Sequence, residues 1–216
     1  LIAQTINKVV GDNISQVIEL MSALGFYMFT LILGLILHIC ISYLFLLKYY
    51  TKMPIQYFFK GIAPAQLLAF STSSSGATLP ITMERCEDEL GVSEEISSFV
   101  LPLGATINMD GTAQYQAVAA VFISQALGMD LTIGDQITII LTTVLASIGT
   151  AAVPAAGIIM LIIILESVGV PSAGVALILG VDRILDMART TVNVTGDAAV
   201  AVSVASSEKQ LKTYSK

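Results

Sequence analysis

The stretch from Leu20 to Leu47 carries no charged side chain and is almost entirely apolar. About 20 apolar residues suffice to cross a bilayer as a helix, so these roughly 28 residues are predicted to form a transmembrane helix with room for tilt. The whole chain is 55% hydrophobic and only 12% charged, whereas about a quarter of the residues of a soluble domain are charged. The sequence therefore predicts an integral, multi-pass membrane protein.

The remaining ionisable and reactive side chains exclude several classes of protein. A net charge of −6 offers no basic surface, so we expect no nucleic-acid partner. Cys40 and Cys86 lie in dissimilar contexts without the spacing of metal ligands, and both are expected as free thiols. His38 is the only imidazole in the apolar run and is expected to pack against a neighbouring helix. We predict no organic cofactor.

Two further apolar segments are too short to cross a membrane alone. Ile62–Phe70 has about nine residues, against the roughly 20 that a helical span needs, and runs into the Ser-rich sequence 71–76. The pattern returns at Ile137–Ala146, followed by small residues at 147–154 and an apolar stretch at 157–165. Both are predicted as re-entrant hairpins around one buried polar cavity, because non-helical backbone at membrane depth needs polar partners. Helix packing through Ser and Gly is the alternative, but it does not account for the Pro beside each turn.

Lysines indicate how these segments are oriented. Cytoplasmic loops are rich in Lys and Arg. We therefore expect two lysine clusters on the cytoplasmic side: Lys48, Lys52 and Lys60, and Lys209, Lys212 and Lys216. The number of crossings between the clusters is then even, and Phe99–Leu127 and Val175–Val204 supply two if each hairpin returns to its own side. The first hairpin enters from inside and the second from outside, which is an inverted repeat.

The crossing expected at Phe99–Leu127 contains a break. Glycines flank Asn108 and Asp110, which is poor helix chemistry and in a membrane indicates unwound carbonyls turned toward a cation. Asp110 and Asp197 would supply charge, whereas Asn108 and Asn193 would supply neutral oxygens. Hard cations select oxygen ligands, so this set predicts a site for a hard metal cation. Local capping or pairing by Asp110 is the alternative.

Polar side chains recur along one face of the last predicted helix. Asp182, Asp186, Arg189, Asn193 and Asp197 fall within roughly 80° of one another at about 100° per residue. A solvated face on a surface helix would show the same pattern. The residues around the stripe are mostly apolar, so a buried hydrophilic site within a membrane explains it better.

Four sequence strings together resemble one known family. SSSGATLP, LPLGATINMDGTA, LASIGTAAVPAAG and ILDMARTTVNVTGD look like signature segments of the glutamate transporter family. This family includes excitatory amino acid transporters and prokaryotic sodium-coupled aspartate or glutamate symporters. The resemblance implies an all-α polytopic membrane protein, with transmembrane helices and two re-entrant helical hairpins in an inverted repeat. It also implies a homotrimer in which an elevator-type transport domain moves against a scaffold.

The chain is similar to the carboxy-terminal half of the proteins of this family. This similarity implies a location in the plasma (inner) membrane and divides the chain into seven segments. Residues 1–19 would end a scaffold helix and form a loop, 20–52 a transmembrane helix, 53–91 the inner re-entrant hairpin, 92–129 a broken transmembrane helix with NMDGT, 130–170 the outer re-entrant hairpin, 171–208 the transmembrane helix with the polar stripe, and 209–216 a cytoplasmic tail.

The resemblance also implies which residues hold a substrate. Arg189 would grip a side-chain carboxylate, which suits the bidentate geometry of a guanidinium, and Asp186 would receive an α-amino group. The turn from Val153 to Gly157 would close as the outer gate. The implied substrate residues are Ser74, Ser75, Thr112, Val153, Gly157, Asp186, Arg189, Thr190 and Asn193.

Sodium is the co-transported ion that the resemblance implies. The implied ligand residues are Gly104, Thr106, Asn108, Asp110, Ser147, Ile148, Thr150, Asn193 and Asp197. Ser147, Ile148 and Thr150 belong to the second hairpin and would contribute only when that hairpin is closed over substrate. Ion and substrate would then stabilise the same conformation, and each would raise the affinity of the other.

Some positions depart from the family's pattern. Ser73 and Met187 stand where archaeal and animal members, respectively, carry an arginine. Arg183 lies one turn before Met187, and its side chain is expected to supply a compensating charge. Asp182 has no ligand role and is expected to orient or neutralise Arg183. Gln116 stands where animal members have a glutamate linked to proton co-transport, so we expect no proton coupling through that group.

These expectations combine into one function. We predict a sodium-coupled symporter of aspartate or glutamate, not an enzyme, whose partners are the acidic amino acid, the bilayer and further copies of itself. A proton-coupled glutamate or dicarboxylate symporter, a neutral amino acid exchanger and, less favoured, an ion channel are the alternatives. An intramembrane protease is disfavoured because the serines lack a His partner and the aspartates lie beside Arg189, which would keep them ionised.

Overall fold

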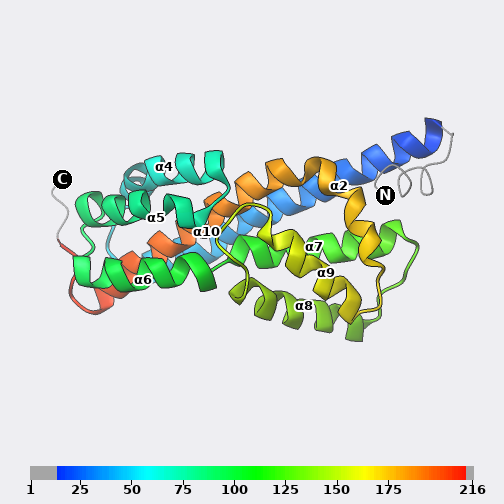
Figure 1. The fold of residues 1–216 in the computed structure, drawn as a ribbon. Helices are drawn as coiled ribbons and strands as arrows, with labels where there is room; N and C mark the ends of the chain where they lie inside the picture. Colours follow the sequence, from blue (N-terminus) through cyan, green and yellow to red (C-terminus); the bar gives the residue numbers. More distant parts are fainter. Residues whose placement is uncertain (1–13, 213–216) are drawn as a thin grey trace.

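The computed structural model describes residues 14–212, and the regular structure in that range is helical (Figure 1). The described residues form no β-strand beyond one isolated antiparallel bridge between Val92 and Leu211. This confirms the prediction of an all-α chain. Residues 1–13 of the expected scaffold segment and residues 213–216 of the expected tail lie outside the described residues.

The helices follow one another with short connections. In chain order they are α2 (Ile14–His38), the π-helix η1 (Ile39–Tyr43), α3 (Leu44–Tyr50), α4 (Ile55–Thr72), α5 (Ser75–Glu84), the π-helix η2 (Arg85–Glu89), α6 (Glu94–Ile107), α7 (Asp110–Ala126), α8 (Ile133–Ile148), α9 (Ala156–Ser167), the 3-10 helix η3 (Ser172–Leu177) and α10 (Leu179–Ser207).

The longest apolar rod runs through α2, η1 and α3. Its 34 residues from Val17 to Tyr50 make it the one helix, within the described part of the chain, that is both long enough and apolar enough to cross a membrane. α8 and α9 are apolar but shorter. α10 has 29 residues and carries the charged stripe on a helix that is otherwise largely buried. Length and hydropathy together therefore single out the first rod alone.

A sharp reversal joins α4 to α5. Ser73 ends α4 in the left-handed conformation, with φ 54°, and its amide donates to the Ala69 carbonyl at 2.9 Å. Ser74 then caps α5 by accepting a hydrogen bond from the Ala77 amide at 3.1 Å. Two residues thus provide hydrogen bonds for backbone groups at the C-terminus of α4 and at the N-terminus of α5. The two helices fold back on each other as a pair.

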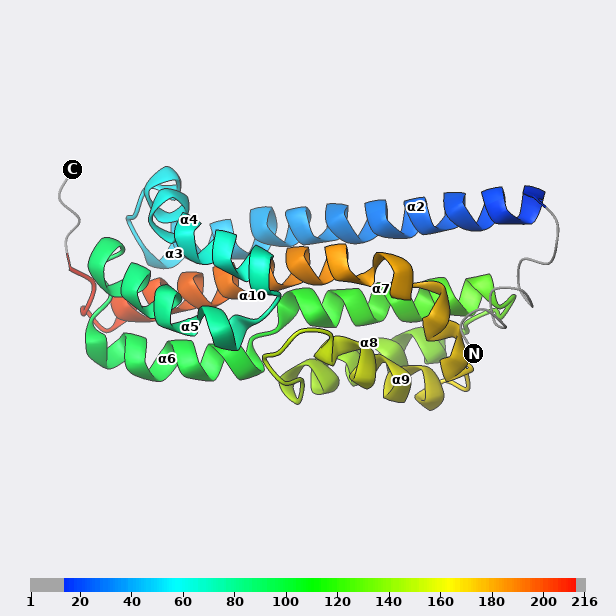
Figure 2. The ribbon, with the colours of Figure 1, turned by 45° about the horizontal axis from the view of Figure 1, so that its top comes forward.

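A second pair forms from α8 and α9. A capping box between Thr132 and Asp135 starts α8, α8 ends before Gly149, and α9 begins after Ala155, which has φ 61°. Figures 1 and 2 show the two helix pairs approaching from opposite ends of an elongated molecule. Their connecting turns meet, because the Gly76 amide donates to the Ala152 carbonyl at 3.2 Å.

α10 runs through the middle of the molecule and packs against α2, α3, α4, α5, α6 and α7 (Figure 2). α6 and α7 form one line of helix interrupted at Asn108 and Met109, beside the centre of α10. The interruption and the two connecting turns therefore converge on the same part of α10.

Candidate substrate and cation site

A cavity of about 20 Å³ lies at this convergence. It is lined by the α4–α5 turn, the α6–α7 interruption, the α8–α9 turn and α10. The lining residues are Ser73, Ser75, Met109, Thr112, Thr150, Ala151, Ala152, Val153, Gly157, Asp186, Arg189, Thr190 and Asn193. Every predicted substrate residue except Ser74 belongs to this set, together with Thr150 from the predicted sodium set.

Arg189 is the dominant charge of the cavity and is only 1% exposed. Its Nη2 atom donates to Asp186 Oδ1 at 2.7 Å and lies 3.7 Å from Asp182 Oδ1. The guanidinium carbon stands 3.6 Å from the centre of the Tyr115 ring, a cation–π geometry. Nε and Nη1 are buried without a hydrogen-bond partner. The guanidinium thus retains donors that a bound anion would satisfy.

Asp186 connects α10 to the α8–α9 turn. One of its oxygens holds Arg189, and the other, Oδ2, accepts a hydrogen bond from the Ala155 amide at 3.0 Å. The carboxylate therefore links the buried arginine to the backbone of the turn.

The two turns are also bonded directly to each other. The Ser74 hydroxyl donates to the Ala152 carbonyl at 2.7 Å, and the Gly76 amide donates to the same carbonyl. Ser74 is therefore placed at the contact between the turns and not in the cavity wall, unlike its neighbour Ser75.

Asn193 fixes the α6–α7 interruption against α10. Its Oδ1 atom accepts from the Gly111 amide at 2.8 Å, and its Nδ2 atom donates to Thr112 Oγ1 at 3.1 Å. A Cβ on Gly111 would come within 2.8 Å of the Arg189 carbonyl oxygen. Glycine at this position is what lets the start of α7 approach α10 so closely.

Fewer of the predicted cation ligands than of the predicted substrate residues lie together in the structure. Asn108 Nδ2 donates to Asp197 Oδ1 at 3.0 Å, and a Cβ on Gly104 would come within 2.6 Å of that same oxygen. Asp197 is 3% exposed, and none of the ion pairs between described residues involves it. These three residues form a buried, oxygen-rich group whose charge is not neutralised by a cationic side chain.

Asp110 lies apart from that group, on the side facing α2. Its Oδ2 atom contacts His38 Nε2 at 3.1 Å and accepts from the Tyr43 hydroxyl at 3.0 Å. His38 does pack against a neighbouring helix, as expected. Its hydrogen bond to Asp110 was not anticipated from the sequence.

Thr106 and the ligands predicted in the second hairpin do not meet, because their hydroxyls bond to backbone carbonyls three or four residues earlier in their own segments. The Thr106 hydroxyl donates to the Leu103 carbonyl, Ser147 to Val144, and Thr150 to Ala146. Ile148 is 48% exposed. α6 and α8 do touch, but among the described residues the Thr106 hydroxyl bonds within α6 and not to the end of α8. Within the described ranges, no group of three His, Cys, Asp or Glu side chains could hold a metal, so a cation would be bound by a carboxylate together with amide and carbonyl oxygens.

Arg183 lies outside the cavity. Its side chain is exposed, and Nη2 is 3.5 Å from the Ser71 carbonyl near the end of α4. The expectation that Asp182 orients Arg183 is wrong, because the Asp182 carboxylate is buried toward Arg189. On a helix, residue 182 shares a face with 186 and 189, whereas its immediate neighbour points elsewhere.

Sequence reasoning missed Tyr115, whose ring carries the Arg189 guanidinium, and Asp182 as a second acid beside it. Tyr115 lies one turn after Thr112 on α7, and that spacing was the available signal.

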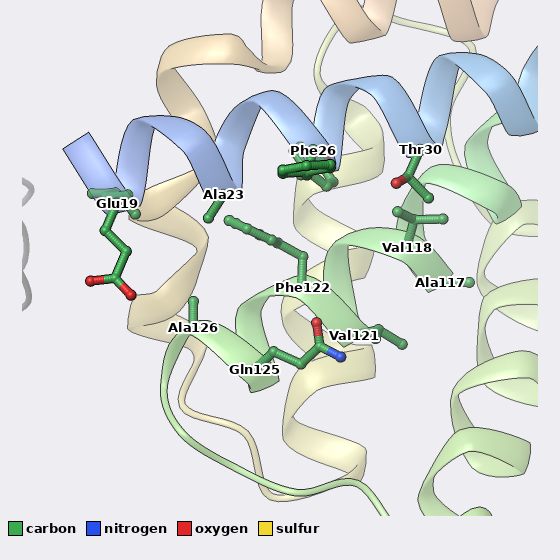
Figure 3. A pocket seen from close by; sticks show the side chains of 12 residues that line it. Glu19, Ala23, Phe26, Thr30, Ala117, Val118, Val121, Phe122, Gln125 and Ala126 are labelled. Atoms are coloured by element: carbon green, nitrogen blue, oxygen red, sulfur yellow. The ribbon is translucent and has the colours of Figure 1, made fainter. Parts of the chain in front are cut away.

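A larger cavity of about 780 Å³ lies between α2 and α7 (Figure 3) and is lined mainly by apolar residues such as Phe26, Val118 and Phe122. It holds none of the predicted site residues.

Comparison with known proteins finds related transporters. Residues 2–207 match the model of the sodium:dicarboxylate symporter family. An excitatory amino acid transporter of Caenorhabditis elegans is 48% identical over 81% of this chain and 35% of its own length. Excitatory amino acid transporter 2 of Mus musculus is 47% identical over 81% of the chain and 31% of its own length. Excitatory amino acid transporter 3 of the same organism is 50% identical over 83% and 34%.

The chain thus spans about a third of the length of these relatives. Their family is one of transporters and not of enzymes. Because the family match extends over nearly all of the sequence, the chain belongs to the sodium:dicarboxylate symporter family.

Proposed function

We propose that the full-length protein is a sodium-coupled symporter of acidic amino acids, and that this chain holds its substrate cavity. The observation that carries the proposal is the buried ion pair between Arg189 and Asp186, closed over by two turns from opposite ends of the molecule. A buried pair is costly to break unless both charges find new partners.

An acidic amino acid supplies both partners. Its side-chain carboxylate would replace Asp186 on Arg189, and its ammonium group would replace Arg189 on Asp186. A neutral amino acid would leave the guanidinium with only the more distant Asp182 carboxylate, 3.7 Å away, and a dicarboxylate without an amine would leave Asp186 without a cation. Breaking such a pair one-sidedly costs about 3–5 kcal/mol. We therefore infer aspartate or glutamate over a neutral amino acid or a plain dicarboxylate.

Entry requires the turns to part. A volume of about 20 Å³ has room for roughly one water molecule. The hydrogen bonds from Ala155 to Asp186 and from Ser74 to Ala152 are those that close the cavity. We propose that the α8–α9 turn opens as the outer gate, that both helix pairs are re-entrant hairpins, and that the closed unit moves as an elevator in alternating access.

Sodium fits the group formed by Asn108, Asp197 and Gly104. A hard cation with an oxygen shell suits one carboxylate, one amide and nearby carbonyls, and the buried Asp197 has no cationic side chain paired with it among the described residues. We propose that Thr106, Asp110, Ser147, Ile148, Thr150 and Asn193 complete the sodium sites when the gate is closed over substrate.

Gln116 argues against the proton-coupled alternative. Its amide nitrogen donates to the Gly157 carbonyl at 3.3 Å, close to the gate. An amide side chain at this position cannot take up and release a proton at physiological pH, whereas a carboxylate can.

Membership of the family and the resemblance of the motifs support a multi-pass homotrimer in the plasma membrane with both lysine clusters in the cytoplasm.

Uptake of labelled aspartate into proteoliposomes tests this function. Full-length protein with sodium outside and choline inside is expected to accumulate aspartate, and replacing external sodium with choline should abolish accumulation. Uptake driven by an inward proton gradient without sodium would contradict the proposal.

Removing the Ser74 hydroxyl should loosen the closed cavity. Ser74→Ala deletes the hydrogen bond to Ala152 as well as the cap of α5, and we expect roughly fivefold weaker aspartate binding, equivalent to about 1 kcal/mol. Ser93→Ala is the matched control, because Ser93 caps α6 by the same kind of bond but lies away from the turns. Equal losses in both variants, measured with labelled aspartate, would contradict the closing role of Ser74.

Arg183 is proposed to supply the compensating positive charge near the α4–α5 turn, from its position beside the Ser71 carbonyl. An arginine near a helix C-terminus interacts favourably with the exposed carbonyls, by about 0.3–1 kcal/mol at an exposed site. Arg183→Ala should therefore slow transport or weaken aspartate binding about twofold to fivefold, and Arg183→Lys should retain most of both. Unchanged affinity and rate in Arg183→Ala would refute the role.

A further inference from the structure

The long first helix changes its winding where it passes Asp110. α2 ends at His38, and Ile39–Tyr43 continues as a π-helix. Five residues on an α-helix span about 500°, so residues 38 and 43 would point about 140° apart. A π-helix closes i to i+5 bonds and brings such residues onto one side. His38 and Tyr43 accordingly lie together, with ring centres 4.8 Å apart in an edge-to-face arrangement.

Both side chains reach the same carboxylate oxygen. His38 Nε2 lies 3.1 Å from Asp110 Oδ2, and the Tyr43 hydroxyl donates to that atom at 3.0 Å. On the far side of the imidazole, Ser42 Oγ lies 3.2 Å from His38 Nδ1. A hydroxyl donating to Nδ1 would keep the imidazole proton on Nε2, where Asp110 accepts it. Oδ1, the other oxygen of Asp110, receives neither bond.

Tyr43 also lies close to the cation group. A Cβ on Gly196 would collide with the Tyr43 hydroxyl and come within 3.1 Å of Asn108 Nδ2. The hydroxyl therefore donates to Asp110 from a position beside Gly196, the residue that precedes Asp197. Tyr43 is 3% exposed, so its position is fixed by packing against α10.

We propose that His38 and Tyr43 are positioning residues for sodium: through the π-helical turn they hold Oδ2 of Asp110 and leave Oδ1 free to bind the ion at the α6–α7 interruption. The inference rests on the proposed sodium coupling, and it assigns a role to two residues that do not themselves bind sodium or substrate. It also explains why the helix departs from α geometry at this place.

The experiment measures sodium dependence directly. Aspartate binding by purified full-length protein in detergent is followed at increasing NaCl, with choline chloride keeping ionic strength constant. His38→Leu and Tyr43→Phe should each raise the half-saturating sodium concentration by about fivefold to tenfold, while aspartate affinity at saturating sodium stays unchanged. His38→Gln, whose amide can donate in place of Nε2, should restore most of the wild-type sodium affinity.

Tyr57→Phe is the matched control, because it removes a tyrosine hydroxyl bond, here to the Glu89 carbonyl at 2.8 Å, far from Asp110. It should leave sodium dependence unchanged. The rise in melting temperature on adding NaCl gives a second readout, and it should shrink in His38→Leu and Tyr43→Phe only.

Two results distinguish a failure of this inference from a failure of the proposed sodium-coupled symport. If wild-type protein shows no sodium dependence, the proposed symport fails. If wild-type binding needs sodium but His38→Leu and Tyr43→Phe keep its half-saturating concentration, the positioning role is wrong. Lower melting temperatures in choline with an unchanged sodium response would likewise overturn it, because a bond that only ties α2 to α7 predicts that outcome.

Discussion

Arg189→Ala is expected to weaken aspartate binding by at least roughly 100-fold, equivalent to about 3 kcal/mol. The guanidinium is buried, bonded to Asp186 and stacked on Tyr115, and water in the space it leaves would not supply a positive charge for the carboxylate. The variant keeps Asp186, which can still bind an ammonium group. We therefore expect it to accept a neutral amino acid such as alanine better than the wild type does, in the same proteoliposome uptake assay.

Arg189→Lys is the matched variant. It keeps the charge but lacks the planar fork that bonds a carboxylate with two parallel hydrogen bonds, so aspartate binding should fall less than in Arg189→Ala while neutral amino acids stay excluded. If Arg189→Ala still took up aspartate with wild-type affinity, the substrate carboxylate would have to bind elsewhere.

Asp197→Asn is expected to raise the half-saturating sodium concentration at least tenfold, equivalent to about 1.4 kcal/mol. The substitution keeps shape but removes the buried charge that sodium would neutralise. Without sodium, the same loss of an uncompensated buried charge should stabilise the protein. The melting temperature in choline should therefore rise, and the further rise on adding NaCl should shrink.

Glu208→Gln is the control for that variant, since Glu208 is an exposed acid at the end of the same helix. It should change neither sodium dependence nor melting temperature. A lower melting temperature of Asp197→Asn in choline would indicate that Asp197 is a structural acid and would contradict its assignment to sodium.

The helical class could be predicted from the sequence because apolar composition and helix-breaking residues act locally. Glycines around Asn108 mark the interruption between α6 and α7. The π-helix at Ile39–Tyr43 has no such marker, because it contains neither Gly nor Pro, and the partner of the side chains at its two ends is Asp110, far along the chain. Local sequence carries no information about that partner.

In the candidate site, too, some features could be predicted from local sequence and others depend on contacts between distant parts of the chain. The stripe on α10 is a periodicity, so Asp186, Arg189 and Asn193 could be placed on one face from the sequence and line the cavity in the structure. The same periodicity places Asp182 on the face of Arg189 and not beside Arg183, whereas the ring of Tyr115 reaches Arg189 only through the packing of α7 on α10. Ser74 meets Ala152 only through the approach of two separate helix pairs.

The exchange of charges at Arg189 and Asp186 is tested most directly by competition. Sodium-dependent uptake of labelled aspartate into proteoliposomes containing full-length protein would be measured with excess unlabelled glutamate, asparagine or succinate. The first competitor has both an amine and a side-chain carboxylate, the second lacks the carboxylate, and the third lacks the amine. We predict strong inhibition by glutamate and little by asparagine or succinate, whereas inhibition by succinate as strong as that by glutamate would contradict the account.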